Sequence, residues 1–99
     1  MRQAIMTAPG TVKIVEAAIP EPNSKQVQIN IKRIGICGSD VHVWHGAHPF
    51  TSYPVIQGHE YCGIVSKIGA DVTDICEGQL VTALPQEVCG KCVPCRRGN

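Results

Sequence analysis

The sequence has almost no net charge, because nine Lys and Arg residues oppose eight Asp and Glu residues over 99 positions. This balance argues against a protein that binds nucleic acid or another polyanion, since such proteins carry a strong basic excess. No apolar run approaches the roughly 20 residues that cross a bilayer. Thr7 and Pro9 interrupt the first residues before a signal peptide's apolar stretch could form. We therefore expect a cytoplasmic protein with no nucleic-acid and no membrane partner.

Leucine is also scarce, with two Leu against 11 Val and 11 Ile. Side chains branched at Cβ suit a pleated sheet better than a helix, and ten Gly and seven Pro residues punctuate the chain. The length corresponds to one small domain or to a piece of a larger chain. The composition therefore predicts a mainly β domain.

The hydrophobic pattern predicts five strands, over residues 2–6, 11–16, 26–32, 61–68 and 79–84. Pro9-Gly10 predicts a hairpin turn between the first two. The apolar phase shifts after Lys32, which indicates a bulge near Lys32-Arg33 in the third strand, and Gly35-Ile36-Cys37-Gly38 then breaks that strand. Ser39 and Asp40 are suited to cap a short helix that ends near Trp44. Residues 46–58 contain two Gly and two Pro, and a loop of this length is usually functional or mobile.

Three cysteines near the end of the chain form a C-x2-C-x2-C array: Cys89, Cys92 and Cys95. Closely spaced thiolates select zinc or an iron–sulfur cluster. The bacterial ferredoxin run would need a fourth Cys at position 99, which is Asn99, so zinc is favoured. Unligated thiols and a disulfide framework remain the alternatives. A structural zinc takes four ligands, and this array supplies three.

A second group of ligand-type residues is spread along the chain: Cys37 follows one predicted strand, and His59-Glu60 precedes another. A thiolate, an imidazole and a carboxylate are ligands of catalytic zinc sites. The spacing does not show that the three residues meet. The metalloprotease pattern H-E-x-x-H fails at Gly63, whereas a Cys nucleophile with a His base stays open, although no local protease signature surrounds Cys37.

Taken together, four motifs resemble the zinc-dependent medium-chain alcohol dehydrogenase family, and most of all its sorbitol/polyol dehydrogenase branch. They are Gly35-Ile36-Cys37-Gly38-Ser39-Asp40-Val41-His42, Gly58-His59-Glu60, Gly63-Ile64-Val65 and Cys89-Gly90-Lys91-Cys92-Val93-Pro94-Cys95-Arg96-Arg97-Gly98. The resemblance implies a GroES-like, partly open β-barrel with short helices. Residues 1–99 would be the N-terminal portion of the catalytic domain, with 84–99 beginning a structural-zinc lobe and a Rossmann domain following.

The resemblance also implies residue roles. Cys37 and His59 would be ligands of a catalytic zinc, with Glu60 as an occasional ligand or just behind the ligands. Three of four structural-zinc ligands would be Cys89, Cys92 and Cys95, the fourth being expected eight residues beyond Cys95. The cofactors would be Zn2+ and NAD or NADP, the substrate a small alcohol or polyol, and the full-length protein a homo-oligomer, either a dimer or a tetramer.

The expected reaction interconverts a secondary alcohol and its ketone. The Ser39 hydroxyl would accept the alcohol proton, and His42, on the same helical face, would pass it to solvent. Trp44 and Phe50 are candidates to line the substrate pocket. No two glycines are two residues apart, so a G-x-G-x-x-G motif is lacking, and we expect the 99 residues alone to be inactive. The alternative is a stand-alone zinc-binding structural or interaction module.

Four further residues receive no role in this chemistry. His45 and His48 lie in the loop rich in Gly and Pro, and we expect both to be solvated. Cys62 and Cys76 are expected to be small buried hydrophobic residues, the usual state of a free Cys.

Overall fold

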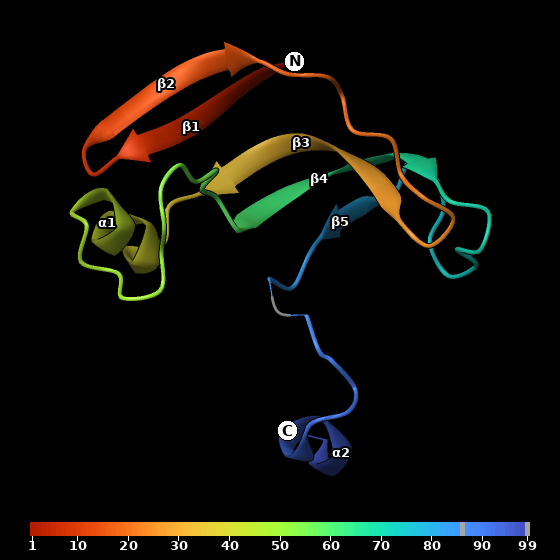
Figure 1. Cartoon of the computed structure of the whole chain (residues 1–99). Coiled ribbons are helices and arrows are strands. Elements are labelled where there is room, and N and C mark those ends of the chain that lie inside the picture. The colour runs from red at the N-terminus through yellow and green to blue at the C-terminus, as the bar shows by residue number, and fades with distance from the viewer. Residues whose placement is uncertain (86, 99) are drawn as a thin grey trace.

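Two separate antiparallel sheets carry most of the regular structure (Figure 1). The structure is a computed structural model that describes residues 1–85 and 87–98. The elements, in chain order, are β1 (Arg2–Ala8), β2 (Thr11–Glu16), β3 (Val27–Gly35), α1 (Gly38–Trp44), β4 (Glu60–Ile68), β5 (Leu80–Thr82) and α2 (Val93–Arg97). β1 pairs with β2, and the second sheet has the order β3-β4-β5. The prediction of a mainly β domain is confirmed.

The β1–β2 hairpin turns at Pro9-Gly10, as the sequence predicts. Gly10 has φ +69°, a left-handed backbone conformation that glycine adopts without steric cost. Its N–H donates a hydrogen bond to the Trp44 carbonyl at 2.9 Å. The tip of the hairpin is therefore attached to the end of α1, which lies between β3 and β4 of the other sheet in the sequence.

The pairing of β3 with β4 contains the predicted bulge, because the register shifts between Ile31 and Arg33. β3 continues past the bulge and ends at Gly35, within the predicted strand break at residues 35–38. After the bulge the register places Gly35 opposite Glu60. The end of β3 and the start of β4 therefore lie side by side at one end of the sheet.

Helix α1 begins two residues earlier than a Ser39 cap would place it. Cys37 is the N-cap residue, with extended backbone angles, and its N–H donates to Asp40 Oδ2 at 2.9 Å. Asp40 therefore caps the helix from its third position by reaching back, which is one half of a capping box. The predicted end at Trp44 is confirmed.

The loop over residues 46–58 is held by two neighbours. Met6 and Val55 exchange backbone hydrogen bonds of 2.9 Å in each direction, which joins the loop to β1. Tyr53 donates from its hydroxyl to the carbonyl of Val43, which joins the loop to α1. Met6 and Val43 are buried, so the loop covers part of a small core.

The fold is open. Its radius of gyration is 15.9 Å, whereas a compact domain of this length has about 13 Å. Among the described residues, the buried hydrophobic side chains are Met6, Val43 and Val65, while Ile34 and Ile36 are 65% and 83% exposed. The two sheets do not close on each other, as expected for a partly open barrel. No helix in the described part of the chain is long and apolar enough to span a membrane.

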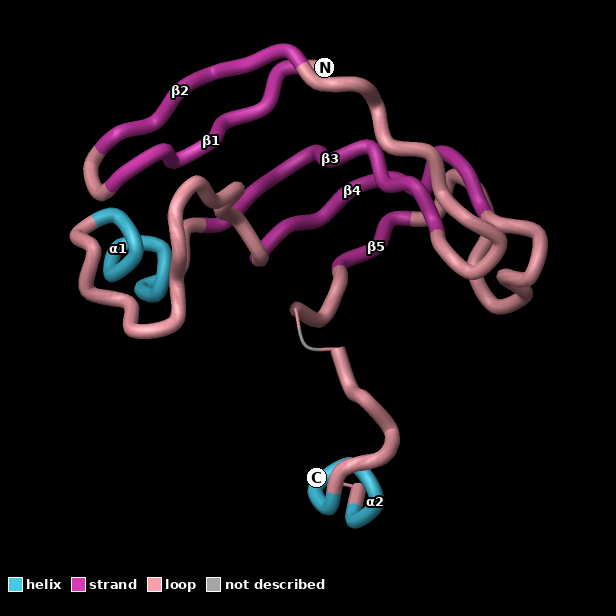
Figure 2. The backbone as a smooth tube through the Cα atoms, viewed as in Figure 1, coloured by secondary structure: helices cyan, strands magenta, loops and turns pink. Residues whose placement is uncertain are grey.

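The chain after β5 leads away from both sheets and ends in α2 (Figure 2). β5 is shorter than the predicted strand over 79–84, and α2 was not predicted. The expected zinc lobe over 84–99 includes Gln86 and Asn99, which lie outside the described residues. Cys76 is exposed, so the prediction that it is buried is wrong, whereas Cys62 is half-buried.

Candidate metal centres

The β3–β4 register brings Cys37, His59 and Glu60 together. Cys37 lies two residues beyond the end of β3, and His59 lies immediately before β4. The Cys37 sulfur, a ring nitrogen of His59 and a carboxylate oxygen of Glu60 all lie within 4.8 Å of one another. Cys37 and His59 are half-buried and Glu60 is exposed. This donor set suits a zinc ion that keeps one coordination position open.

Asp40 also belongs to this site, although the sequence predicts only a helix cap there. Its Oδ1 lies 3.6 Å from His59 Nδ1, while its Oδ2 accepts the Cys37 N–H. A carboxylate on one ring nitrogen fixes the tautomer and orientation of a metal-binding histidine. The available signal was an acidic residue three positions after Cys37, within the same turn. On the other side of the ring, Ser39 Oγ lies 3.5 Å from His59 Nε2.

The electrostatics of the pair favour its charged form. Hydrogen bonds from Ser39, and then one from His59, lower the pKa of the Cys37 thiol. The hydrogen bond with Cys37 raises the pKa of His59, against the opposing effect of desolvation. A thiolate stabilised in this way is ready to bind a cation, because the thiolate rather than the thiol is the metal ligand.

The other predicted site residues lie around this group without converging on it. His42 is exposed in the last turn of α1, one turn after Ser39. Trp44 is 42% exposed and lies beside the hairpin tip at Gly10. Phe50 is 91% exposed and packs edge-on to His48, with 6.3 Å between ring centroids.

A cavity of about 220 Å³ adjoins Ser39 and His59. Its other lining residues come from α1 and the long loop, and they include His48 and Thr51 but neither Trp44 nor Phe50. His48 is half-buried, and Thr51 Oγ1 lies 2.8 Å from its Nδ1. The prediction that His48 is solvated is therefore wrong, while His45 is exposed as expected. No sequence pattern points to His48, because its position depends on how the loop folds back over α1.

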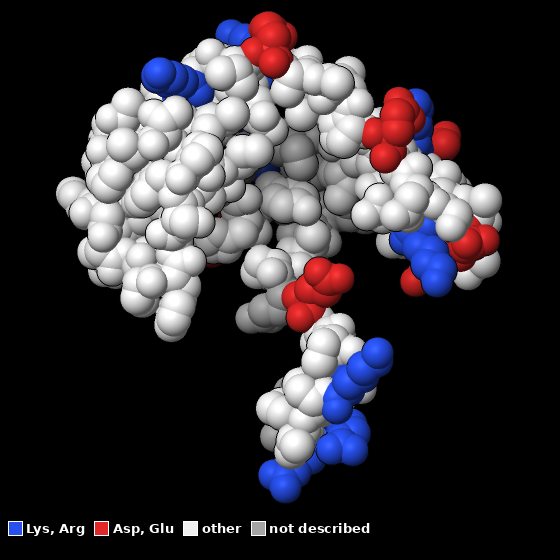
Figure 3. Space-filling model, in the orientation of Figure 1, with Lys and Arg blue, Asp and Glu red and all other residues white. Residues whose placement is uncertain are grey.

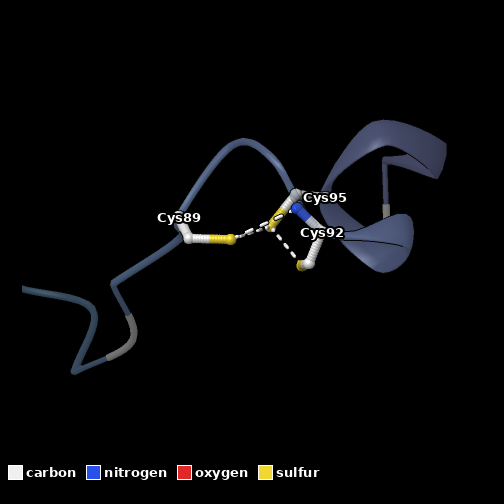
Figure 4. A group of neighbouring side chains, drawn as sticks. All are labelled: Cys89, Cys92 and Cys95. Atoms are coloured by element: carbon white, nitrogen blue, oxygen red, sulfur yellow. Dashed lines mark hydrogen bonds between the residues drawn. The ribbon is translucent and has the colours of Figure 1, made fainter.

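The second candidate centre is the cysteine cluster, defined as Cys89, Cys92 and Cys95 (Figure 4). The Cys95 sulfur lies 3.2 Å from that of Cys92 and 3.8 Å from that of Cys89. Sulfurs at two corners of a tetrahedral zinc site, each about 2.3 Å from the ion, are about 3.8 Å apart. The separation of the Cys89 and Cys95 sulfurs matches this value, that of Cys92 and Cys95 is shorter, and all three sulfurs lie within 4.8 Å of one another, close enough to share one zinc ion.

The local chain conformation explains this spacing. Gly90 has φ +71°, which lets the backbone turn between Cys89 and Cys92. Cys92 is the N-cap of α2, and Cys95 lies within that helix. Basic side chains gather at this end of the molecule (Figure 3), and α2 carries Arg96 and Arg97 in its last turn. Their charges offset those of several thiolates.

Cys89 allows a prediction about pH. The backbone N–H groups of Lys91 and Cys92 lower the pKa of its thiol to about 7, whereas an ordinary thiol has a pKa of about 8.5. In metal-free, reduced protein, alkylation of Cys89 by iodoacetamide should therefore rise with pH through a midpoint near 7. At pH 7 about half of the thiol would be ionised, and after allowing for the lower nucleophilicity of a less basic thiolate we expect a rate about threefold above that of N-acetylcysteine.

Peptide mass spectrometry after timed alkylation at several pH values measures this profile. A midpoint at 8.5 or above for Cys89 would contradict the hydrogen-bonded arrangement around its sulfur.

Comparisons with known proteins bear on these two centres. The family model of the alcohol dehydrogenase GroES-like domain matches residues 23–99. The starvation-sensing protein RspB of Escherichia coli (strain K12) is 38% identical over 99 residues, which are 100% of this chain and 29% of that protein. The L-galactonate-5-dehydrogenase of the same strain is 42% identical over 81 residues, or 82% of this chain and 24% of the enzyme.

A solved structure agrees with this match. The cobalt- and zinc-bound thermostable alcohol dehydrogenase from Pyrobaculum aerophilum superposes with a TM-score of 0.83 at 35% identity, covering 99% of this chain and 30% of that one. The expected GroES-like fold is therefore confirmed. The chain spans between 24% and 29% of the two curated relatives described above.

Proposed function

This chain belongs to the alcohol dehydrogenase GroES-like domain family, and from that premise we propose that it forms the metal- and substrate-binding part of a zinc-dependent dehydrogenase. The whole protein would interconvert a secondary alcohol or polyol and its ketone, with NAD or NADP as hydride acceptor or donor. One observation carries the proposal: donor atoms of Cys37, His59 and Glu60 lie within 4.8 Å of one another, beside the Ser39 hydroxyl.

The chemistry of these donors fits zinc. Cys37 and His59 would hold the ion, and Glu60 would be a third or intermittent ligand. When bound, a zinc ion with an open position acts as a Lewis acid that makes an alcohol hydroxyl more acidic. Asp40, at 3.6 Å from His59 Nδ1, would orient the imidazole so that its other nitrogen faces the ion.

Two residues of α1 would move the proton that the alcohol loses. Ser39 is half-buried next to His59, and its hydroxyl can accept this proton while passing its own onward. His42 lies one helical turn later and is exposed, so its imidazole can exchange the proton with bulk water. We propose that this path runs from Ser39 Oγ through His42.

The cavity beside Ser39 and His59 supports a hydroxylated substrate. The His48 imidazole and the Thr51 hydroxyl hydrogen-bond to each other, and each keeps further hydrogen-bonding capacity that hydroxyl groups of a polyol can use. The similarity to L-galactonate-5-dehydrogenase, an enzyme named for a polyhydroxylated substrate, points in the same direction. Trp44 and Phe50 remain candidate pocket residues, and the oligomeric state of the whole protein remains a prediction.

The metal content separates this proposal from its alternative. A stand-alone zinc-binding module needs only the cysteine cluster, so it should bind one metal ion, whereas a dehydrogenase domain should bind two. We expect inductively coupled plasma mass spectrometry of the zinc-loaded, desalted chain to give two zinc ions per molecule. The Cys37→Ser variant should give one. A ratio of one for both proteins, with the metal lost only when the cluster is changed, would favour the module.

A further inference from the structure

Gly35 occupies an unusual place beside the first metal centre. It is the last residue of β3, and the register places it opposite Glu60. A Cβ atom added at Gly35 would lie 3.0 Å from Glu60 Oε2 and 3.2 Å from Glu60 Cβ. Gly35 is not among the glycines with positive φ. The position therefore needs glycine for the space it leaves, and not for its backbone angles.

The crowding at Gly35 is specific to Glu60. All three of the nearest atoms to the added Cβ belong to that residue. At Gly38, three residues later, an added Cβ would have nothing within 4 Å. At Gly63, in contrast, it would meet the carbonyl oxygen of Asn30 at 2.5 Å, so that glycine allows two backbones to approach. Of these three glycines, only Gly35 makes room for the side chain of a candidate metal ligand, Glu60.

The Glu60 carboxylate has no other means of being held there. It is exposed, and within residues 1–85 and 87–98 no hydrogen bond or ion pair restrains it. An unrestrained glutamate on a strand surface samples several rotamers. The free space above Gly35 allows the rotamer in which a carboxylate oxygen of Glu60 lies within 4.8 Å of the Cys37 sulfur and the His59 ring nitrogen.

We infer that Gly35 is a positioning residue: it leaves the space through which the Glu60 carboxylate reaches the metal held by Cys37 and His59. This inference rests on the proposed function, because it requires that metal. A methyl group at residue 35 would push the Glu60 side chain aside. Turning the flexible carboxylate away relieves the 3.0 Å contact with Oε2, and a shift of a few tenths of an ångström relieves the remaining 3.2 Å contact with Glu60 Cβ.

Cobalt binding to the full 99-residue chain tests this inference without any measurement of turnover. The background variant carries serine at Cys89, Cys92 and Cys95, so that Co2+ reports on the other centre alone. In this background we compare four further variants: Gly35→Ala, Glu60→Ala, the double variant, and Gly38→Ala as the matched control. Absorption titration gives the affinity, and the intensity of the visible bands reports the coordination number of the cobalt.

Loss of an oriented ligand or of its support typically weakens metal binding by 10–100-fold. We expect Glu60→Ala and Gly35→Ala each to weaken cobalt binding by about tenfold and to change the visible bands in the same way. The double variant should bind no more weakly than Glu60→Ala alone. Gly38→Ala should bind like the background.

The double variant also decides the matter if Gly35→Ala does not fold, as judged by circular dichroism. Restoration of the fold in the double variant would support the inference, because alanine keeps the Cβ of residue 60 and the clash would then be with the atoms beyond it. Failure to restore it would overturn the inference. So would additive losses in the double variant, or cobalt affinity in Gly35→Ala equal to that of the background. If the background itself bound no cobalt, the proposed metal centre would fall, which is a distinguishable result.

Discussion

Under the proposed function, replacing Cys37 by alanine is expected to lower kcat/KM for polyol oxidation by the whole protein by about a thousandfold or more. The Cys37 sulfur is one of three donors that lie within 4.8 Å of one another, and alanine supplies no replacement. Lewis-acid activation of a substrate oxygen contributes several kcal/mol, and each 1.36 kcal/mol corresponds to about a factor of ten in rate. Steady-state rates with sorbitol and NAD or NADP, together with the zinc content of the same sample, measure the effect.

Cys76 provides the matched control for this substitution. It is exposed and belongs to neither candidate metal centre. The Cys76→Ala variant should therefore keep the wild-type rate and both zinc ions. Retention of more than a tenth of the wild-type kcat/KM by Cys37→Ala, with zinc content unchanged, would contradict the role assigned to the Cys37 sulfur.

Removing the metal from the cysteine cluster is expected to unfold α2 and leave the sheets intact. This helix has five residues, and isolated helices shorter than about 12 residues are marginal in water. It extends away from both sheets (Figure 2), so it receives little support from them. A structural zinc ion supplies folding free energy directly in such segments. After chelation, we expect trypsin to cleave at Lys91, Arg96 or Arg97 more than tenfold faster.

The internal reference for this experiment lies in β3. Both Lys32 and Arg33 lie within β3, where Arg33 pairs with Cys62 of β4 and Lys32 is the residue at the bulge, so cleavage there should change little when zinc is removed. Equal cleavage of the C-terminal segment with and without zinc would show that the cluster does not organise this part of the chain. The variant Cys92→Ser should behave like the chelated wild type even when zinc is present.

Local sequence patterns predicted much of the fold, because each depends on near neighbours in the chain. The Pro9-Gly10 turn follows from backbone preferences. The bulge before Arg33 follows from a shift in the apolar alternation, and the structure has both features. Helix α2 was missed because its five residues follow no apolar period. Its only local features are a proline near its start and Gly98 at its end.

The metal centre of Cys37, His59 and Glu60 could not be predicted from the spacing of these residues in the sequence. Cys37 and His59 are separated by 22 positions, and nothing local shows that a helix and a long loop return the chain to the same place. The convergence depends on the β3–β4 register, which sets Gly35 opposite Glu60. Only the resemblance of the surrounding motifs to a known family suggested it in advance. The role of Asp40 at this site was not predicted for a related reason, because its contact with His59 joins α1 to the segment just before β4.

Anomalous diffraction at the zinc absorption edge, from crystals of the zinc-loaded chain, tests the central claim most directly. The account predicts an ion about 2.3 Å from the Cys37 sulfur and about 2.0 Å from a nitrogen of His59, separate from any ion on the cysteine cluster. An anomalous peak on the cluster alone, with the Cys37 and His59 side chains turned away from each other, would contradict it.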